Sequence, residues 1–206
     1  TYDLSEKIIL YSQYAKLIGE VSNETLGSGF VPLGIRTKWG FMDLLAEFRI
    51  GSRRFLFNYW DRSYDLNRIL IVNSENLTKE SQLFQYGNLN GIYFKADMNI
   101  MNVVEWSISY QNIQGEKWNS TINQFENSKS NQTFITAAKL NTSIIPKIGK
   151  AEMFYQQSNT PHPFEFIPNS STVLGYNIGF ELSESVMLFY KVRTTYIVDS
   201  DQFDSF

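Results

Sequence analysis

The single histidine of the chain, His162, is the first residue to consider for catalysis, and it stands between two prolines. A catalytic histidine needs a nucleophile or a carboxylate held close to it, and no such partner stands at a recognisable spacing. The chain contains no cysteine, which excludes thiolate chemistry, disulfides and cysteine-ligated zinc. We therefore expect no catalytic residue, no metal site and no cofactor, and we expect that the protein is not an enzyme.

A dense group of aromatic and charged residues between positions 59 and 65 could bind a sugar. Aromatic rings stack on sugar rings, while carboxylates and arginines hydrogen-bond the sugar hydroxyls. A self-packed loop is the alternative interpretation, and we favour it. The residues concerned are Tyr59, Trp60, Asp61, Arg62, Tyr64 and Asp65.

Charged residues recur at every second position in several stretches, each between apolar neighbours. A small sealed core could not hold so many charges, because each unpaired buried ion costs several kcal/mol. The charged face must therefore meet water, either on the outside of the protein or inside a wide lumen. In the second case the lumen-lining residues are Arg36, Lys38, Asp43, Glu47, Arg49, Lys95, Asp97, Glu105, Lys139, Lys150, Glu152, Glu181, Lys191 and Arg193.

The same period-two alternation predicts β-strands with one apolar and one polar face. The clearest case is 92–113, where two alternating runs joined by a short connection predict an antiparallel hairpin. We predict nine strands, over residues 7–18, 30–39, 42–50, 92–100, 103–113, 134–141, 150–156, 174–182 and 186–196. Residues 19–29, 51–90, 114–132 and 159–171 are predicted as loops, with 53–59 extending the third strand.

Most of these strands are about 9–12 residues long, whereas a globular strand has about 5–6. A tilted strand needs about 9–11 residues to cross a bilayer. The predicted connections alternate between short turns and long loops, as in an up-and-down membrane barrel. We expect one β-barrel region over residues 1–206, with no domain boundary.

Composition excludes other classes of protein. No run of about 18 apolar residues is present, so the sequence predicts no transmembrane helix. The net charge of -3 has the wrong sign for a nucleic-acid-binding protein. No basic-then-apolar segment opens the chain, so we expect any signal peptide to have been removed or never present.

In this pattern of strands, turns and faces the chain resembles a bacterial outer-membrane β-barrel of the porin type. The resemblance covers nearly the whole chain but carries no diagnostic motif. It implies an outer-membrane location, export with removal of a signal peptide, and insertion by the barrel-assembly machinery. Aromatic residues near the strand ends suit the girdles of such barrels: Tyr14, Trp39, Tyr110, Tyr155, Tyr176 and Tyr196.

The segment 4–11 echoes the segment 182–189, in which a full strand precedes the turn. We therefore expect the chain to begin at the end of a missing strand. Nine is also an odd number, whereas single-chain bacterial barrels have even numbers of strands. We interpret the chain as part of a larger, even-stranded barrel.

Three functions from different classes remain open at this point. The first is a porin-like passive diffusion channel for small polar solutes. The second is a non-conducting barrel that serves as a structural scaffold, an assembly component or a surface binding protein. The third is a soluble β-sheet ligand-binding protein, which requires the apolar stripes to face each other. In the first two cases the partners are outer-membrane lipid, the assembly machinery, and a second copy or another envelope protein.

Overall fold

The structure is a computed structural model, and it describes residues 2–5, 7–21, 23–60, 64, 68–72, 75–169, 171–183 and 185–196. Strands dominate these residues, and the short helices η1 (Ser81–Gln85), η2 (Thr142–Ile144) and η3 (Pro163–Glu165) lie between them. The strands are β1 (Tyr2–Ser5), β2 (Ile8–Lys16), β3 (Glu20–Val21), β4 (Glu24–Thr25), β5 (Ser28–Trp39), β6 (Met42–Gly51), β7 (Ile69–Val72), β8 (Glu75–Thr78), β9 (Tyr86–Ile100), β10 (Val104–Asn119), β11 (Gln124–Leu140), β12 (Ile148–Thr160), β13 (Thr172–Ser183) and β14 (Val186–Thr195).

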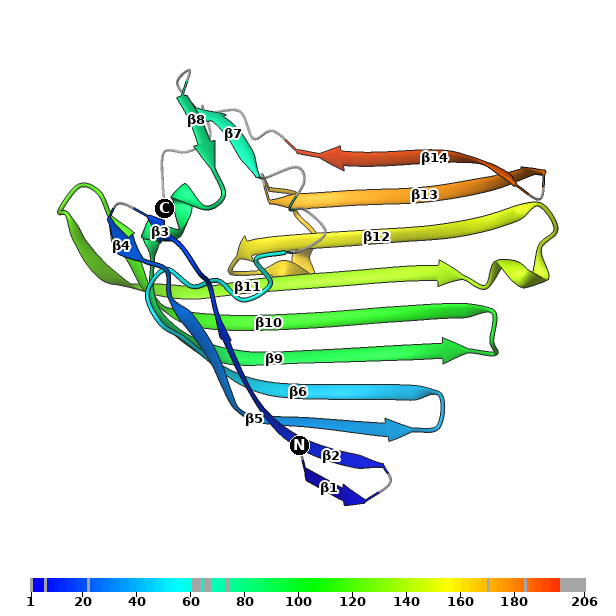
Figure 1. Cartoon of the computed structure of the whole chain (residues 1–206), viewed down its shortest axis with the longest axis horizontal. Helices are drawn as coiled ribbons and strands as arrows, with labels where there is room; N and C mark the ends of the chain where they lie inside the picture. The colour runs from blue at the N-terminus through cyan, green and yellow to red at the C-terminus, as the bar shows by residue number, and fades with distance from the viewer. Residues whose placement is uncertain are drawn as a thin grey trace. The chain divides into compact units, whose positions relative to one another are not determined.

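Ten of these strands form one antiparallel sheet in the order β1-β2-β5-β6-β9-β10-β11-β12-β13-β14, and Figure 1 shows the strands in this order. The prediction of an all-β antiparallel fold is confirmed. Within the described ranges β1 and β14 are the two edges of the sheet, and no sheet closes into a barrel. No helix among the described residues is long and apolar enough to cross a membrane.

The chain forms two compact units, and strands β5, β6, β9, β10 and β11 contribute residues to both. Unit 1 comprises the described residues of Thr1–Thr37, Leu45–Tyr93 and Gln111–Asn131. It contains the antiparallel pairs β1–β2 and β2–β5 and the small hairpins β3–β4 and β7–β8. Val21, Leu26 and Leu83 form a small apolar core there, against which Leu17, Leu56, Tyr59, Phe84 and Tyr86 pack.

Unit 2 comprises the described residues of Lys38–Leu44, Phe94–Tyr110 and Gln132–Phe206. Its strands β12, β13 and β14 form antiparallel pairs, and residues 132–139 of β11 pair with β12. The prediction of a single region over residues 1–206 stays a prediction.

The burial of β13 reverses the pattern of a soluble sheet. Its small and polar residues Gly175, Asn177 and Gly179 are buried, while the intervening Leu174, Tyr176 and Phe180 are 37%, 38% and 42% exposed. Strand β6 shows the same reversal, because Arg49 is 7% exposed while Phe48 and Ile50 are 43% and 41% exposed. We call the buried side the polar face and the exposed side the apolar face.

Several predicted element boundaries are wrong. The predicted loop 114–132 belongs mostly to β10 and β11, which are joined by the short turn 120–123, so short and long connections do not alternate strictly. The predicted strand extension 53–59 forms no strand, and the predicted loop 19–29 contains the hairpin β3–β4 and the start of β5. Residues 114–132 lack apolar alternation, yet backbone hydrogen bonds extend a strand whatever its side chains are.

A bulge in β5 changes the predicted face of Val31. Gln13 pairs with Val31 and Tyr11 pairs with Gly34, so β5 holds one residue more than β2 over this interval. Pro32, which has no backbone N–H for the ladder, stands inside the bulge. Strict alternation along the predicted strand 30–39 places Val31 on the same face as Ile35, but Val31 is 4% exposed and lies on the buried side, whereas Ile35 is 39% exposed.

Candidate functional site

The polar face of unit 1 carries a buried ion pair. Arg49 Nε and Nη2 both lie 2.7 Å from Glu47 Oε2, and each side chain is 8% exposed. Both residues come from β6 at positions two apart, so the alternation of the strand places them on one face. A buried pair of this kind is stable only when hydrogen bonds satisfy its remaining donors and acceptors.

Three other residues complete this set, which we call the Arg49 network: Tyr11, Glu47, Arg49, Asn58 and Gln111. The hydroxyl of Tyr11 on β2 donates a hydrogen bond to Glu47 Oε1. Arg49 Nη1 donates to Gln111 Oε1 on β10 at 2.6 Å and lies 3.5 Å from Asn58 Oδ1. Asn58 Nδ2 donates to the same Gln111 oxygen at 3.3 Å. The network therefore joins β2, β6, β10 and the turn after β6.

Aromatic rings cover the guanidinium of this network. Arg49 Cζ lies 3.6 Å from the centroid of the Tyr93 ring and 5.0 Å from that of Phe57. Contacts at these distances are favourable cation–π interactions. Tyr11 lies over Gly34 of the neighbouring strand, where a Cβ atom would approach Tyr11 Cζ to 2.4 Å. Only glycine at position 34 leaves room for this ring.

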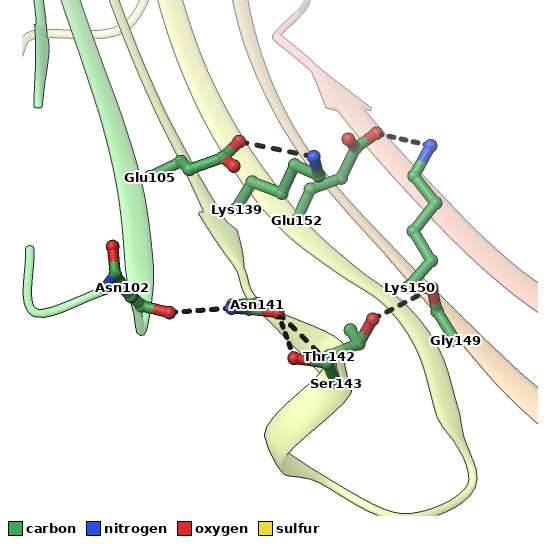
Figure 2. A network of polar contacts seen from close by, with 9 residues as sticks. All are labelled: Asn102, Glu105, Lys139, Asn141, Thr142, Ser143, Gly149, Lys150 and Glu152. Atoms are coloured by element: carbon green, nitrogen blue, oxygen red, sulfur yellow. Dashed lines mark hydrogen bonds and ion pairs between the residues drawn. The ribbon is translucent and has the colours of Figure 1, made fainter. Parts of the chain in front are cut away.

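The polar face of unit 2 carries a row of residues that stand directly opposite one another on successive strands. Lys139 of β11 pairs with Glu152 of β12, Glu152 with Asn177 of β13, and Asn177 with Lys191 of β14. Lys139 Nζ also lies 3.2 Å from Glu105 Oε2 of β10, as Figure 2 shows. Together these are the Lys139 row: Glu105, Lys139, Glu152, Asn177 and Lys191.

The Lys139 row alternates in charge and is more open to solvent than the Arg49 network. The side chains of Lys139 and Glu105 are 58% and 61% exposed, so their ion pair contributes at most about 1 kcal/mol. Glu152 also lies 3.1 Å from Lys150 Nζ and accepts a hydrogen bond from the amide of Asn177. The pairing holds charged side chains along the sheet surface.

A polar turn stands beside this row in Figure 2. Asn141 Oδ1 accepts hydrogen bonds from the backbone N–H and the hydroxyl of Ser143 at 3.2 and 2.7 Å, which caps η2. Asn141 Nδ2 donates to the carbonyl of Asn102 at 2.7 Å. Thr142 Oγ1 donates to the carbonyl of Gly149 at 3.2 Å. One asparagine thus connects the β9–β10 turn to the β11–β12 turn.

The structure brings several of the predicted lumen residues into contact with one another. Besides the two sets above, Lys95 Nζ and Asp97 Oδ2 form a 2.7 Å ion pair along β9. Among the remaining predicted lumen residues, Asp43 is half-buried, while Arg36, Lys38, Glu181 and Arg193 are exposed. Their assignment to a lumen stays a prediction.

The predicted sugar-binding loop contains an aromatic cluster. The ring centroids of Tyr59 and Trp60 are 5.1 Å apart, and those of Trp60 and Tyr64 are 4.3 Å apart. Lys79 Nζ donates to the carbonyl of Tyr59 at 2.7 Å and lies 5.3 Å from the centroid of its ring. Burial raises the pKa of the Tyr59 hydroxyl, as do Tyr64 and Glu80 nearby. Asp61, Arg62 and Asp65 lie outside the described residues.

The predicted aromatic girdle is exposed at some positions and covered at others. Tyr14 and Trp39 are 65% and 69% exposed, and Tyr176 is also exposed. Tyr110 and Tyr155 are half-buried, because Phe164 and Phe166 from the segment after β12 pack on them at centroid distances of 5.4 and 5.7 Å. Tyr196 is half-buried at the end of the described chain. The segment 161–169 therefore covers part of the apolar face.

His162 is exposed, and its backbone N–H donates to Thr160 Oγ1 at 3.3 Å. Among the described residues no group of three or more His, Asp and Glu side chains could hold a metal ion. No catalytic arrangement was predicted from the sequence, and that expectation stays a prediction.

The four uncharged members of the two sets were missed in the sequence analysis: Tyr11, Asn58, Gln111 and Asn177. Tyr11, Gln111 and Asn177 each stand at an alternate position of a predicted strand, so their faces could be inferred from periodicity. Asn58 lies in a turn and had no such signal. No protein-family model matches the chain, and no curated protein matches its sequence.

Proposed function

We propose that the chain is part of an outer-membrane β-barrel, with its apolar face toward lipid and its polar face lining a water-filled passage. The observation that carries this proposal is the reversed burial of β13, where polar and small residues are covered and large apolar residues are exposed. A soluble protein rarely leaves a contiguous apolar surface of this extent uncovered.

Two further observations support lipid on the apolar face. Strands β9, β10 and β11 contain 15, 16 and 17 residues, more than the roughly 9–11 residues that cross a bilayer. Trp106 is 39% exposed, and its indole N–H donates to Thr136 Oγ1 at 2.8 Å. In lipid an indole N–H needs such a partner, because hydrocarbon offers it none.

Within this proposal the protein is a porin-like channel through which small polar solutes diffuse passively. The Lys139 row alternates in charge, so its side chains pair along the wall and leave an opening of weak ion selectivity. The barrel-assembly machinery would insert the protein into the outer membrane, and lipid would be its main partner.

A non-conducting barrel is the second candidate, and the Arg49 network favours it. Glu47 and Arg49 are almost completely covered and hydrogen-bonded to neighbours, so a network of this kind can also fill an interior. Such a barrel would act as a scaffold, an assembly component or a surface binding protein. A soluble ligand-binding sheet is the least supported, because it needs a partner surface over the exposed apolar residues.

Conductance separates the two barrel functions. We expect the purified protein to insert into a planar bilayer and to give stepwise ohmic currents. Co-flotation with lipid vesicles in a density gradient checks insertion independently. Insertion without current would overturn the channel and support the scaffold, and failure to float would overturn both.

A further inference from the structure

A pocket in unit 1 is lined by two arginines, two glutamates and three aromatic side chains. Its volume is about 620 Å³, within the range of about 300–1,000 Å³ that is typical of small-molecule sites. The lining comes from β4, the turn after β6, η1, the end of β10 and the start of β11. The residues are Glu24, Arg53, Arg54, Phe84, Glu116, Trp118, Asn123, Gln124 and Phe125.

The charges of the pocket cancel in pairs. Arg53 Nε lies 3.5 Å from Glu116 Oε2, and Arg54 Nη2 forms an ion pair with Glu24. Arg53 Cζ also lies 4.5 Å from the centroid of the Phe125 ring. A pocket with equal numbers of cations and anions has little attraction for a strongly charged ligand. It offers donors and acceptors side by side, which suits a neutral ligand with many hydroxyl groups.

One donor in the pocket lacks an acceptor. Arg54 Nε is buried without a hydrogen-bond partner, although its Nη2 is paired. An unsatisfied buried donor costs about 1–3 kcal/mol, and because this nitrogen is closed to solvent a ligand can reach Arg54 only at its other side-chain atoms. The backbone of Arg54 has φ 61°, unusual for this residue, and is held by hydrogen bonds to Tyr86 and Gly27 at 2.8 and 3.3 Å.

The aromatic residues supply a flat apolar surface beside these polar groups. The Trp118 and Phe125 rings meet edge to face with centroids 5.1 Å apart. Arginine–glutamate pairs beside an indole ring match a sugar, which presents C–H groups on one face and hydroxyls around its rim. We propose that this pocket binds a short neutral saccharide, with Trp118 under the sugar ring and the Arg53–Glu116 and Arg54–Glu24 pairs hydrogen-bonding its hydroxyls.

Calorimetric titration and saturation-transfer NMR on the whole chain test this site. The protein is held in a zwitterionic detergent without a sugar head group, and the probes are maltotriose, cellotriose and chitotriose, with citrate as the anionic comparison. We expect at least one trisaccharide to bind with a dissociation constant of about 1 mM or tighter, and citrate to bind more weakly.

The variants identify the site. Trp118→Ala should weaken saccharide binding by about tenfold, and Arg54→Lys, which removes the planar guanidinium paired with Glu24, by between about twofold and tenfold. Trp39→Ala is the matched control, because Trp39 is 69% exposed, lies outside the pocket and belongs to no predicted sugar-binding group. If Trp118→Ala does not fold, as judged by circular dichroism, Trp118→Phe keeps an aromatic face and should give a smaller loss.

Three results would overturn the proposal. They are no trisaccharide binding at about 10 mM, tighter binding of citrate than of every trisaccharide, and equal losses in Trp118→Ala and Trp39→Ala. The titration needs neither a bilayer nor a current, so its failure and the failure of the proposed channel are independent.

Discussion

The guanidinium of Arg49 donates a 2.6 Å hydrogen bond to the side chain of Gln111, which lies 62 residues later in the chain. The same guanidinium is paired with Glu47, so one side chain joins β6 to β10 and neutralises a buried carboxylate. Removing Arg49 would therefore leave Glu47 as an unpaired buried charge.

We expect Arg49→Ala to lower the free energy of unfolding by about 3–5 kcal/mol, because the buried Glu47 carboxylate loses its cation. Urea unfolding in lipid vesicles measures this loss. Lys38→Ala, at an exposed position of β5, is the control and should change stability by no more than about 0.5 kcal/mol. Equal small losses in the two variants would mean that Glu47 is solvated.

The side of β14 that meets lipid can be identified with nitroxide labels. The chain has no cysteine, so Tyr190→Cys and Lys191→Cys each give a single labelling position. Tyr190 pairs with Ile178 on the apolar face, and Lys191 pairs with Asn177 on the polar face. Oxygen should relax the nitroxide at position 190 more strongly, because oxygen concentrates in lipid. A water-soluble nickel chelate should relax the nitroxide at position 191 more strongly. The reverse result would show that the faces are inverted.

An arginine on the apolar face tests the depth of β13 in a bilayer. Ile178→Arg, near the middle of the strand, should cost about 2–4 kcal/mol, and Leu182→Arg, near its end, about 0–1 kcal/mol. Urea unfolding of the protein in lipid vesicles measures both free-energy costs. Similar costs at the two positions would contradict a membrane-spanning orientation. On a water-exposed face the cost of an arginine does not depend on its position along the strand.

If the polar face lines a channel, the cations of β14 influence its selectivity. Replacing Lys191 and Arg193 together by glutamine should shift the reversal potential in a salt gradient toward cation preference, with conductance of the same order. Tyr190→Phe, on the opposite face, should leave the reversal potential unchanged. A shift of the reversal potential of equal size in both variants would show that Lys191 and Arg193 do not line the pore.

A glycine on the polar face of β13 gives a packing test. A Cβ atom at Gly175 would lie 2.5 Å from Phe154 Cε1, so Gly175→Ala should cost about 1–3 kcal/mol through overpacking. Adding Phe154→Leu should make the double variant less destabilised than the sum of its single changes. Gly40→Asn is the control, since nothing lies within 4 Å of its Cβ and asparagine tolerates its φ of +59°. Strict additivity would mean that Phe154 does not press on position 175.

The saccharide site could not be predicted from the sequence. The sequence analysis considered sugar binding only at 59–65 and favoured a self-packed loop there, whereas the pocket draws Glu24, Arg54 and Trp118 from three distant stretches of unit 1. Nothing in the spacing of these residues indicates that they meet, because loop ends and strand ends are brought together only by the pairing of the strands.

The sequence by itself determined the strands and most of their faces. Alternation is a local property, since each peptide turns its side chain to the side opposite its neighbour's, and this is how Leu174 and Asn177 could be assigned to different faces before any contact was known. Strand ends were determined less well. Residues 114–119 continue β10 without apolar alternation, because ladder hydrogen bonds use only the backbone.

Only the tertiary structure decided register, partners and the bulge at Pro32. Lys139 stands opposite Glu152 because of the register in which β11 and β12 pair. A shift of this register by one residue would turn either side chain to the other face. Val31 was assigned to the wrong face for the same reason, since one extra residue in β5 reverses the alternation beyond it. Periodicity is contained in a single strand, whereas register depends on two strands and the contacts between them.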